Sequence, residues 1–169
     1  LFISGVQANL IWEDKKANLS KLSSWVDKVP VGTQIVVLPE MFSTGFSMNP
    51  KELAEQMDGP TVCWLKEQAL KRKCIVTGSL IIEEDGKFYN RLIWMLPNGT
   101  HYSYDKRHLF GFAGEEKFYR AGDRKVIVQV NGWKICLQVC YDLRCPVWAR
   151  QSSPSADPSY DVLLYVANW

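Results

Sequence analysis

Within the segment 134–148, a strand-like pattern of residues ends at a cysteine. Apolar residues alternate with other residues up to Val139, which predicts a strand, and Cys140 follows at once. Pro146 suits the first turn of a helix. A thiol at such a strand-to-helix turn lies near backbone N–H groups and a helix N-terminus, a setting that lowers a thiol pKa and supplies oxyanion donors. The pattern is compatible with a nucleophile and also with a buried core thiol.

Two other polar residues occupy the same place in the pattern. Glu40 follows the apolar run 35–38 through Pro39, and Lys106 follows a strand-like run that ends near Tyr104. Ligands of α/β sheets bind beyond the carboxyl ends of the strands, so we expect Glu40, Lys106 and Cys140 to converge. Carboxylate, ammonium and thiol are the groups needed to attack a carbonyl carbon and expel an amine. Each residue alone also has an ordinary structural interpretation, as a cap, a loop charge or a core thiol.

The elements that must position these groups alternate between strand and helix. Predicted strands cover 2–10, 35–38, 74–82, 88–96, 100–104, 126–130, 133–139 and 161–166. One predicted helix follows Asp14 as its cap, and another covers 61–73. Asn131-Gly132 predicts a hairpin, and the Ser/Pro-rich stretch 151–159 predicts a surface loop. The class is α/β with a mixed sheet, without a repeat or a second domain.

Composition narrows the function classes. The chain has 169 residues, of which 47% are hydrophobic, and this suits one compact domain. A net charge of +2 implies neither a nucleic-acid partner nor an anionic membrane surface, and the basic cluster 71–73 is expected to end a helix. No apolar run approaches the roughly 20 residues of a membrane span.

Cysteine usage points to a reducing compartment. Five cysteines are an odd number, and their spacing matches no zinc site, so we predict no metal. Cys63 and Cys74 lie in or beside a helical pattern and are expected to be buried thiols. We therefore expect a cytoplasmic protein rather than a secreted disulfide scaffold.

Three segments resemble the signature segments of the nitrilase superfamily of carbon–nitrogen hydrolases. They are Leu38-Pro-Glu-Met-Phe42, Tyr104-Asp-Lys-Arg-His-Leu-Phe110 and Val139-Cys-Tyr-Asp-Leu-Arg144, in the family's order, and Tyr165-Val-Ala-Asn-Trp169 also fits. The sequence of residues 39–46, together with that of residues 104–110, is most similar to the omega-amidase branch. The resemblance implies hydrolysis of the terminal amide of 2-oxoglutaramate or a similar 2-oxo acid, through a cysteine thioester and with release of ammonia.

The resemblance assigns roles to individual residues. Glu40 matches the general base, Lys106 the lysine that stabilises the transition state, and Cys140 the nucleophile. Glu115 stands where many members carry a second glutamate that positions the substrate or tunes the other groups. The neighbouring Glu116 leaves that placement ambiguous.

Residues next to these signatures are candidates for oxyanion and substrate binding. The backbone N–H of Tyr141 would stabilise the oxyanion together with Lys106, and such a donor is worth roughly 3–4 kcal/mol of barrier. Arg144 could bind a substrate carboxylate or pair structurally with Asp142 or Glu115. Three aromatic residues could wall the pocket or belong to the core: Phe42, Phe46 and Phe112.

The resemblance also implies an architecture. Family members form a four-layer α-β-β-α sandwich, assemble into homodimers or higher homo-oligomers, and need no metal or organic cofactor. We expect residues 1–169 to be one carbon–nitrogen hydrolase domain that is truncated at its C-terminus, lacking the last part of the sandwich. The expected partner is a small-molecule amide, with no nucleic acid and no membrane.

Three alternatives remain open from the sequence. The same triad could act on a nitrile, or the chain could be a catalytically silent, truncated interaction module. A redox-active thiol protein using Cys136, Cys140 and Cys145 is disfavoured because these residues lack Cys-x-x-Cys spacing. The sequence alone decides neither the exact substrate nor the oligomeric state.

Overall fold

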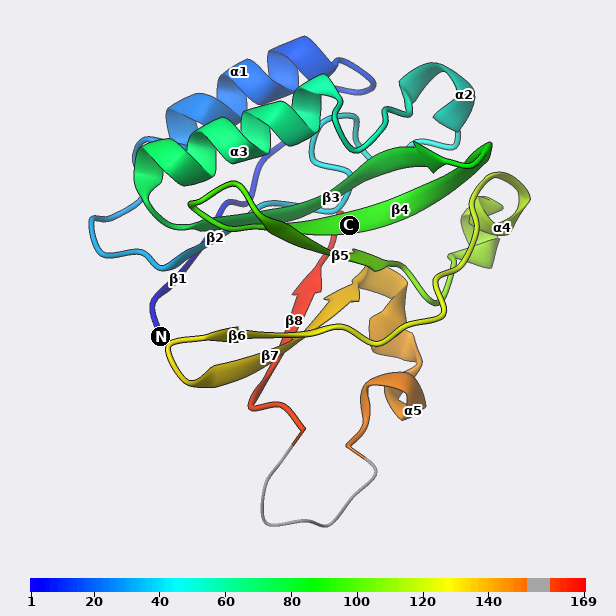
Figure 1. Ribbon diagram of the computed structural model, residues 1–169. Helices are drawn as coiled ribbons and strands as arrows, with labels where there is room; N and C mark the ends of the chain where they lie inside the picture. Colours follow the sequence, from blue (N-terminus) through cyan, green and yellow to red (C-terminus); the bar gives the residue numbers. More distant parts are fainter. Residues whose placement is uncertain (152–158) are drawn as a thin grey trace.

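The computed structural model describes residues 1–151 and 159–169 and contains two β-sheets (Figure 1). The first sheet has the order β1 (Ile3–Gly5), β2 (Ile35–Val37), β3 (Ile75–Glu84), β4 (Lys87–Met95) and β5 (His101–Asp105). The second has the order β6 (Ile127–Val130), β7 (Trp133–Val139) and β8 (Val162–Val166). The surface loop predicted at 151–159 falls mostly on 152–158, outside the described residues.

Strand directions place several strand ends at one edge. In the first sheet β1, β2 and β3 are mutually parallel, whereas β4 runs antiparallel to both β3 and β5. Consequently β5 has the same direction as β2, and the two carboxyl ends point the same way. In the second sheet β6 and β7 form the predicted hairpin, and β8 lies parallel to β7. The prediction of a mixed parallel and antiparallel arrangement is confirmed.

Two long helices cover one face of the first sheet (Figure 1). Helix α1 (Lys15–Val26) begins after Asp14, whose carboxylate accepts a hydrogen bond of 2.9 Å from the Ala17 N–H, as an N-cap does. Helix α3 (Pro60–Arg72) ends where Lys73 adopts a left-handed conformation. The remaining helices are single turns, α2 (Pro50–Leu53), α4 (Glu115–Phe118) and α5 (Pro146–Ala149), and two short 3₁₀ turns cover Gly111–Ala113 and Cys140–Arg144.

The basic cluster at the end of α3 is structural, as predicted. The Lys71 ammonium pairs with the Asp27 carboxylate at the end of α1 at 2.6 Å. The Arg72 guanidinium donates a 2.7 Å hydrogen bond to the backbone carbonyl of Val29. Both side chains therefore tie the C-terminal ends of the two helices together.

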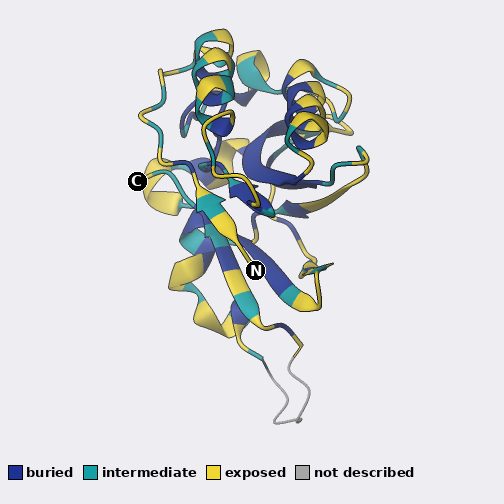
Figure 2. Ribbon diagram, turned by 90° about the vertical axis from the view of Figure 1, so that its left-hand side faces the viewer, coloured by how far each residue is buried: buried dark blue, intermediate teal, exposed yellow. Residues whose placement is uncertain are grey.

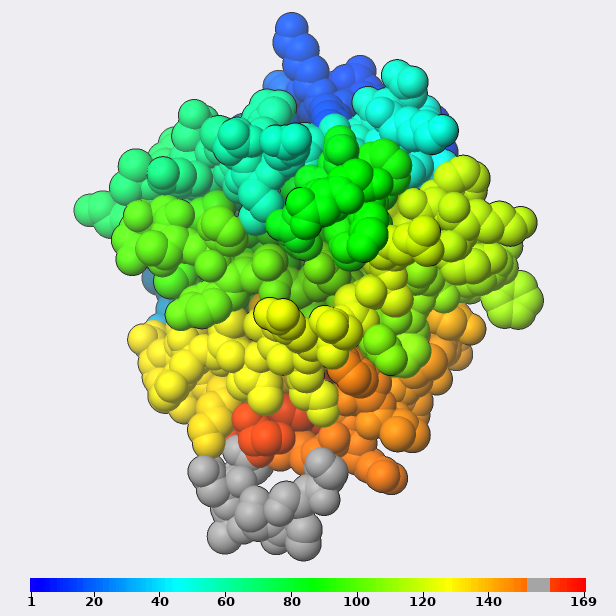
Figure 3. Space-filling view, turned by 45° about the vertical axis from the view of Figure 1, so that its right-hand side comes forward, coloured from blue at the N-terminus to red at the C-terminus, as the bar shows by residue number. Residues whose placement is uncertain are grey.

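The core has two layers, one on each side of the first sheet. Val36 faces the core beneath the helices, whereas Ile35 faces the core between the two sheets. In Figure 2 the outer helix faces are exposed and the central strands are buried. Figure 3 shows the first sheet and its helices in the upper part of the molecule and the second sheet below them.

The described residues form three stacked layers: the two long helices, the first sheet and the second sheet. These are three of the four layers that the resemblance implies. Both long helices lie on the first sheet, and the second sheet is accompanied only by short turns among residues 1–151 and 159–169. No helix in these two ranges is long and apolar enough to cross a membrane.

Two local predictions were wrong. The first strand covers only Ile3–Gly5 instead of 2–10, because its partner β2 ends at Val37. Cys63 is exposed instead of buried, since α3 turns the opposite face towards the sheet, while Cys74 is buried as predicted. All five cysteine thiols are free.

Phe42, predicted as a wall of the pocket or a core residue, belongs to the core beneath the helices. Its ring is fully buried and lies 5.8 Å from the ring of Trp64 in α3. Gly78 in β3 makes room for it, since a Cβ there would lie 2.8 Å from Phe42 Cδ1 and 2.9 Å from the Cβ of Leu38. This close packing fixes the segment 38–42, which contains Glu40.

We expect Gly78→Ala to lower the free energy of unfolding by about 1–3 kcal/mol, because the added methyl group overpacks the core against Phe42. Denaturant unfolding of the protein measures the change. Gly5→Ala is the matched control, since a Cβ at Gly5 meets nothing within 4 Å. Equal effects of the two substitutions would show that packing on Gly78 does not hold this segment.

Candidate active site

The structure brings the three strand ends together at the junction of the two sheets. Glu40 follows β2, Lys106 follows β5, and Cys140 follows β7. Glu40 and Lys106 are completely buried, and Cys140 is 9% exposed. Lys106 Nζ lies 2.9 Å from Glu40 Oε1, and the Cys140 thiol interacts with the Glu40 carboxylate.

Backbone hydrogen bonds hold the turn at Glu40 between the sheets. The Glu40 N–H donates to the carbonyl of Ala167, which follows β8, at 3.3 Å. The next residue, Met41, has a left-handed φ of 45°, and its N–H donates to Ser79 Oγ in β3 at 3.0 Å. Glu40 is therefore anchored to both sheets through its own backbone and that of its neighbour.

Lys106 is bound by two carboxylates. Its ammonium donates to Glu40 Oε1 and to Glu115 Oε2, each at 2.9 Å. The ring of Phe46 covers the ammonium at 5.0 Å from its centroid. Glu115 is fully buried whereas Glu116 is exposed, so the structure places Glu115 at the site.

Asn90 in β4 is a site residue that the sequence did not reveal. Its Nδ2 atom donates to Glu40 Oε1 at 2.8 Å and to Glu115 Oε1 at 3.2 Å. Its backbone carbonyl accepts the N–H of Lys106 at 3.0 Å. Asparagine is depleted in strands, so an Asn inside a predicted strand was the available signal.

Cys140 lies at the predicted sharp turn between strand and helix. Strand β7 ends at Val139, and Cys140 itself begins the 3₁₀ turn that precedes α5. Its φ is 43°, a left-handed conformation that is uncommon for a residue with a side chain and costs of order 1–3 kcal/mol. The backbone of Asn168 stabilises the thiolate form and so acts to lower the pKa of Cys140.

The electrostatics of the thiol differ from the prediction. Burial, together with the Glu40 carboxylate, raises the pKa of Cys140 to about 12, although Lys106 acts in the opposite direction. The prediction of a lowered thiol pKa was therefore wrong, since the turn's dipoles and Lys106 do not outweigh burial beside a carboxylate.

The other two groups have raised pKa values for different reasons. Burial raises the pKa of Glu40, and Lys106 offsets this only in part. Burial disfavours the charged form of Lys106, but the carboxylates of Glu40 and Glu115 outweigh it and raise the lysine pKa. The resting site therefore contains an ammonium and a neutral thiol.

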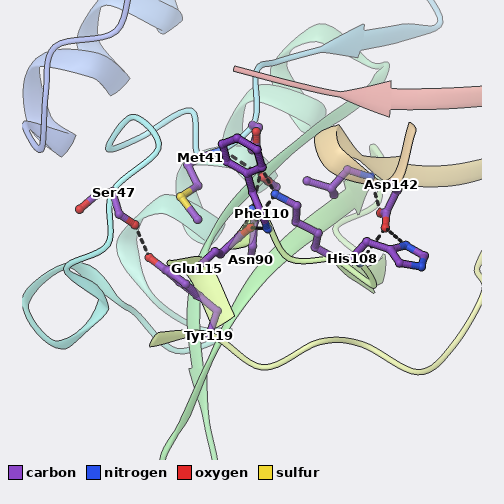
Figure 4. A network of polar contacts seen from close by, with 12 residues as sticks. Met41, Ser47, Asn90, His108, Phe110, Glu115, Tyr119 and Asp142 are labelled. Atoms are coloured by element: carbon purple, nitrogen blue, oxygen red, sulfur yellow. Dashed lines mark hydrogen bonds and ion pairs between the residues drawn. The ribbon is translucent and has the colours of Figure 1, made fainter. Parts of the chain in front are cut away.

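Asp142 links the cysteine turn to the segment after Lys106. Its buried carboxylate accepts hydrogen bonds from the Val139 N–H at 3.0 Å and from the Tyr104 hydroxyl at 2.8 Å. The N–H of His108 also donates to it at 2.9 Å, and the His108 ring contacts it through Nδ1 at 2.8 Å (Figure 4). The sequence suggested Asp142 only as a partner for Arg144.

The remaining predicted residues contact aromatic rings. Arg144 is exposed and its guanidinium lies 5.9 Å from the Trp169 ring centroid, whereas the carboxylates of Asp142 and Glu115 bind other donors. Phe112 is 91% exposed. The Tyr141 ring packs on Phe110, with centroids 5.1 Å apart.

Two cavities adjoin these residues. One of about 500 Å³ is lined by Leu38, Pro39 and Ala167, close to the turn that carries Glu40. A second, of about 380 Å³, is lined by Phe46. Both cavities share Asn168, the residue whose backbone acts to lower the pKa of Cys140.

Sequence comparison finds a family and individual relatives. The family model described as carbon-nitrogen hydrolase matches residues 3–157. The omega-amidase YafV of Yersinia enterocolitica is 40% identical over 164 residues, which are 97% of this chain and 61% of that protein. The 2-oxoglutaramate amidase of Bacillus subtilis is 29% identical over 170 residues, 99% of this chain and 64% of that protein. The chain thus spans somewhat less than two thirds of the length of these relatives.

Solved structures share the fold. A CN-hydrolase superfamily protein from Xanthomonas campestris, with an arsenic adduct in its active site, has a TM-score of 0.94 and 39% identity, covering 99% of this chain and 64% of that one. Nit3 of Saccharomyces cerevisiae, a nitrilase superfamily member, has a TM-score of 0.76 and 28% identity, covering 87% and 58%. The α/β class and the nitrilase-type architecture predicted from the sequence are confirmed.

We expect Lys106→Met to lower the free energy of unfolding at pH 7 by about 3–5 kcal/mol, because two buried carboxylates lose their counter-charge. With Lys106 no longer offsetting burial, the pKa of Glu40 would rise further in the folded state, so the folded protein would bind protons more tightly than the unfolded chain. The deficit should therefore shrink as the pH falls from 7 towards the unfolded carboxyl pKa of about 4.3.

Denaturant unfolding at several pH values measures both effects. Lys71→Met is the matched control, because the Lys71–Asp27 pair is exposed and should change stability by less than about 0.5 kcal/mol. A pH-independent deficit in Lys106→Met would contradict the electrostatic account of the site.

Proposed function

This chain belongs to the carbon–nitrogen hydrolase family, and we propose that the intact protein hydrolyses the terminal amide of a 2-oxo acid such as 2-oxoglutaramate. The observation that carries the proposal is the buried contact of Glu40, Lys106 and Cys140. An omega-amidase and a 2-oxoglutaramate amidase among its relatives support the substrate class.

In the first step the thiol attacks the amide. Cys140 sulfur bonds to the amide carbon, the thiol proton passes to Glu40, and the carbonyl oxygen becomes an oxyanion. An ammonium has three N–H groups, and two of those on Lys106 bind carboxylates. The third, with the backbone N–H of Tyr141, is proposed to stabilise the oxyanion.

The remaining steps return the enzyme to its starting state. Glu40 gives its proton to the amide nitrogen, the carbon–nitrogen bond breaks, and ammonia leaves a thioester on Cys140. Glu40 then takes a proton from water while the oxygen attacks the thioester carbon. Collapse of this second oxyanion breaks the carbon–sulfur bond, releases the acid and returns the proton to the thiol.

The pKa directions support this division of labour. A general base acts best when its pKa lies near the working pH, and burial moves that of Glu40 upwards from the ordinary carboxyl range. Since burial and Glu40 raise the pKa of Cys140, the thiol keeps its proton until attack. Proton transfer to Glu40 therefore accompanies formation of the carbon–sulfur bond.

We further propose the cellular and structural context. Five free thiols support a reducing cytoplasm. The family resemblance supports one hydrolase domain that assembles into a homodimer or higher homo-oligomer and works without metal or organic cofactor. Phe46, which covers the Lys106 ammonium, is the predicted aromatic residue that we propose as a wall of the substrate pocket.

We expect Cys140→Ala in the full-length protein to reduce ammonia release from 2-oxoglutaramate to the uncatalysed background, because no thioester forms. Cys63→Ala is the matched control, since this thiol is exposed on α3 and should leave turnover unchanged. A coupled assay for ammonia with 2-oxoglutaramate, glutamine and a simple nitrile measures both activity and preference.

Three results would change the proposal. Unchanged turnover in Cys140→Ala would remove Cys140 as the nucleophile. A preference for the nitrile would assign the protein to nitrile hydrolysis instead. An inactive full-length protein would favour a silent interaction module.

A further inference from the structure

The donors around the two buried carboxylates are shared unequally. Both oxygens of Glu115 accept hydrogen bonds: Oε1 from Asn90 at 3.2 Å, and Oε2 from Lys106 at 2.9 Å and the Phe110 N–H at 2.6 Å (Figure 4). Glu40 Oε1 accepts from Asn90 and Lys106. Glu40 Oε2 is buried and has no hydrogen-bond donor in the described part of the chain.

This distribution decides where a proton can bind. A carboxylate oxygen that already accepts hydrogen bonds from N–H groups would become an O–H donor if it were protonated. It would then lose those hydrogen bonds. Of the four carboxylate oxygens, only Glu40 Oε2 can take a proton without that loss. The Cys140 thiol, which interacts with this carboxylate, is the adjacent source of the proton.

Asn90 makes the two carboxylates different. Its amide has two N–H groups, and Nδ2 lies within hydrogen-bonding distance of one oxygen of each glutamate. Asn90 Oδ1 accepts no hydrogen bond from the described residues. Rotating the amide by 180° would be less favourable, because Oδ1 would then point at the oxygens of two carboxylates, which are also acceptors. Without the amide, Glu115 Oε1 would also lack a donor and would compete for the proton.

We infer that Asn90 is a positioning residue: by donating to one oxygen of each glutamate, it leaves Glu40 Oε2 as the oxygen that accepts the Cys140 proton. The inference rests on the proposed function, because it specifies how the proposed general base is selected. It concerns the site before substrate binds, so it can be tested without substrate.

Other titratable groups facing Glu40 come from three elements. They are Lys106 at the end of β5, Cys140 after β7, and Glu115 with Tyr119 in and just after α4. The Tyr119 hydroxyl donates to the Ser47 carbonyl at 2.6 Å, and burial, together with Glu115, raises its pKa, so it stays neutral. The loss of Cys140 reactivity at low pH, its acidic limb, should therefore report protonation of the Glu40 carboxylate.

The test is the pH dependence of Cys140 alkylation by iodoacetamide in the full-length protein, followed by mass spectrometry of the peptide. Asn90→Leu removes the amide at similar volume, and because a hydrogen bond to the charged form of Glu40 is lost, the acidic limb should move to higher pH by about one unit. Thr77→Val is the matched control, since it removes a buried 2.8 Å hydrogen bond between β3 and β4. Its limb should coincide with that of the wild type, and an unshifted limb in folded Asn90→Leu would overturn the inference.

Two isosteric variants decide the question even if Asn90→Leu fails to fold. Glu40→Gln should abolish the acidic limb, whereas Glu115→Gln should retain it and move it to lower pH, because a like charge near Glu40 is removed. The opposite pattern would place the proton on Glu115 and overturn the inference. If the alkylation profiles follow these expectations but the protein releases ammonia from no amide, the proposed function is contradicted while the role of Asn90 is supported.

Discussion

One buried ammonium between two buried carboxylates is the interaction on which the site depends. Lys106 contacts Glu40 and Glu115 at 2.9 Å each, and none of the three side chains is exposed. With all three ionised the cluster carries one net negative charge, so the structure is poised to accept a proton. Burial makes this charge costly and so raises the pKa of Glu40, while Lys106 prevents a larger rise. The resulting proton acceptor faces a neutral thiol at Cys140, the combination that amide cleavage through a thioester requires.

The fold brings these charges together through strand ends. The strands before Glu40 and Lys106 run in the same direction within one sheet, and the strand before Cys140 belongs to the sheet packed beneath it. Asp142 then joins the cysteine turn to the chain after Lys106 through hydrogen bonds to backbone and side chains. The left-handed backbone at Cys140 shows that the turn is held by its surroundings and not by local preference.

Local patterns predicted the parts of the site that directly follow apolar strands. Glu40 and Cys140 stand out because each follows an apolar run at a predictable place. The two long helices and the later strands lie close to their predicted positions, whereas the first strand is much shorter than predicted. The ionisation of Cys140 was predicted in the wrong direction, because burial and a carboxylate from another sheet have no signature in the nearby sequence. Asn90 was missed since its partners lie 50 and 25 positions away along the chain. Choosing Glu115 over Glu116 required the orientation of the single-turn helix α4.

Cys140 should carry the acyl group during turnover. Rapid acid quench of the full-length protein with 2-oxoglutaramate, followed by proteolysis and mass spectrometry, detects such an adduct. The peptide containing Cys140 should gain the mass of the substrate acyl group in the first turnover, as ammonia is released and before the acid appears. Ammonia release with no adduct at any quench time, or an adduct on a different residue, would contradict this role of Cys140.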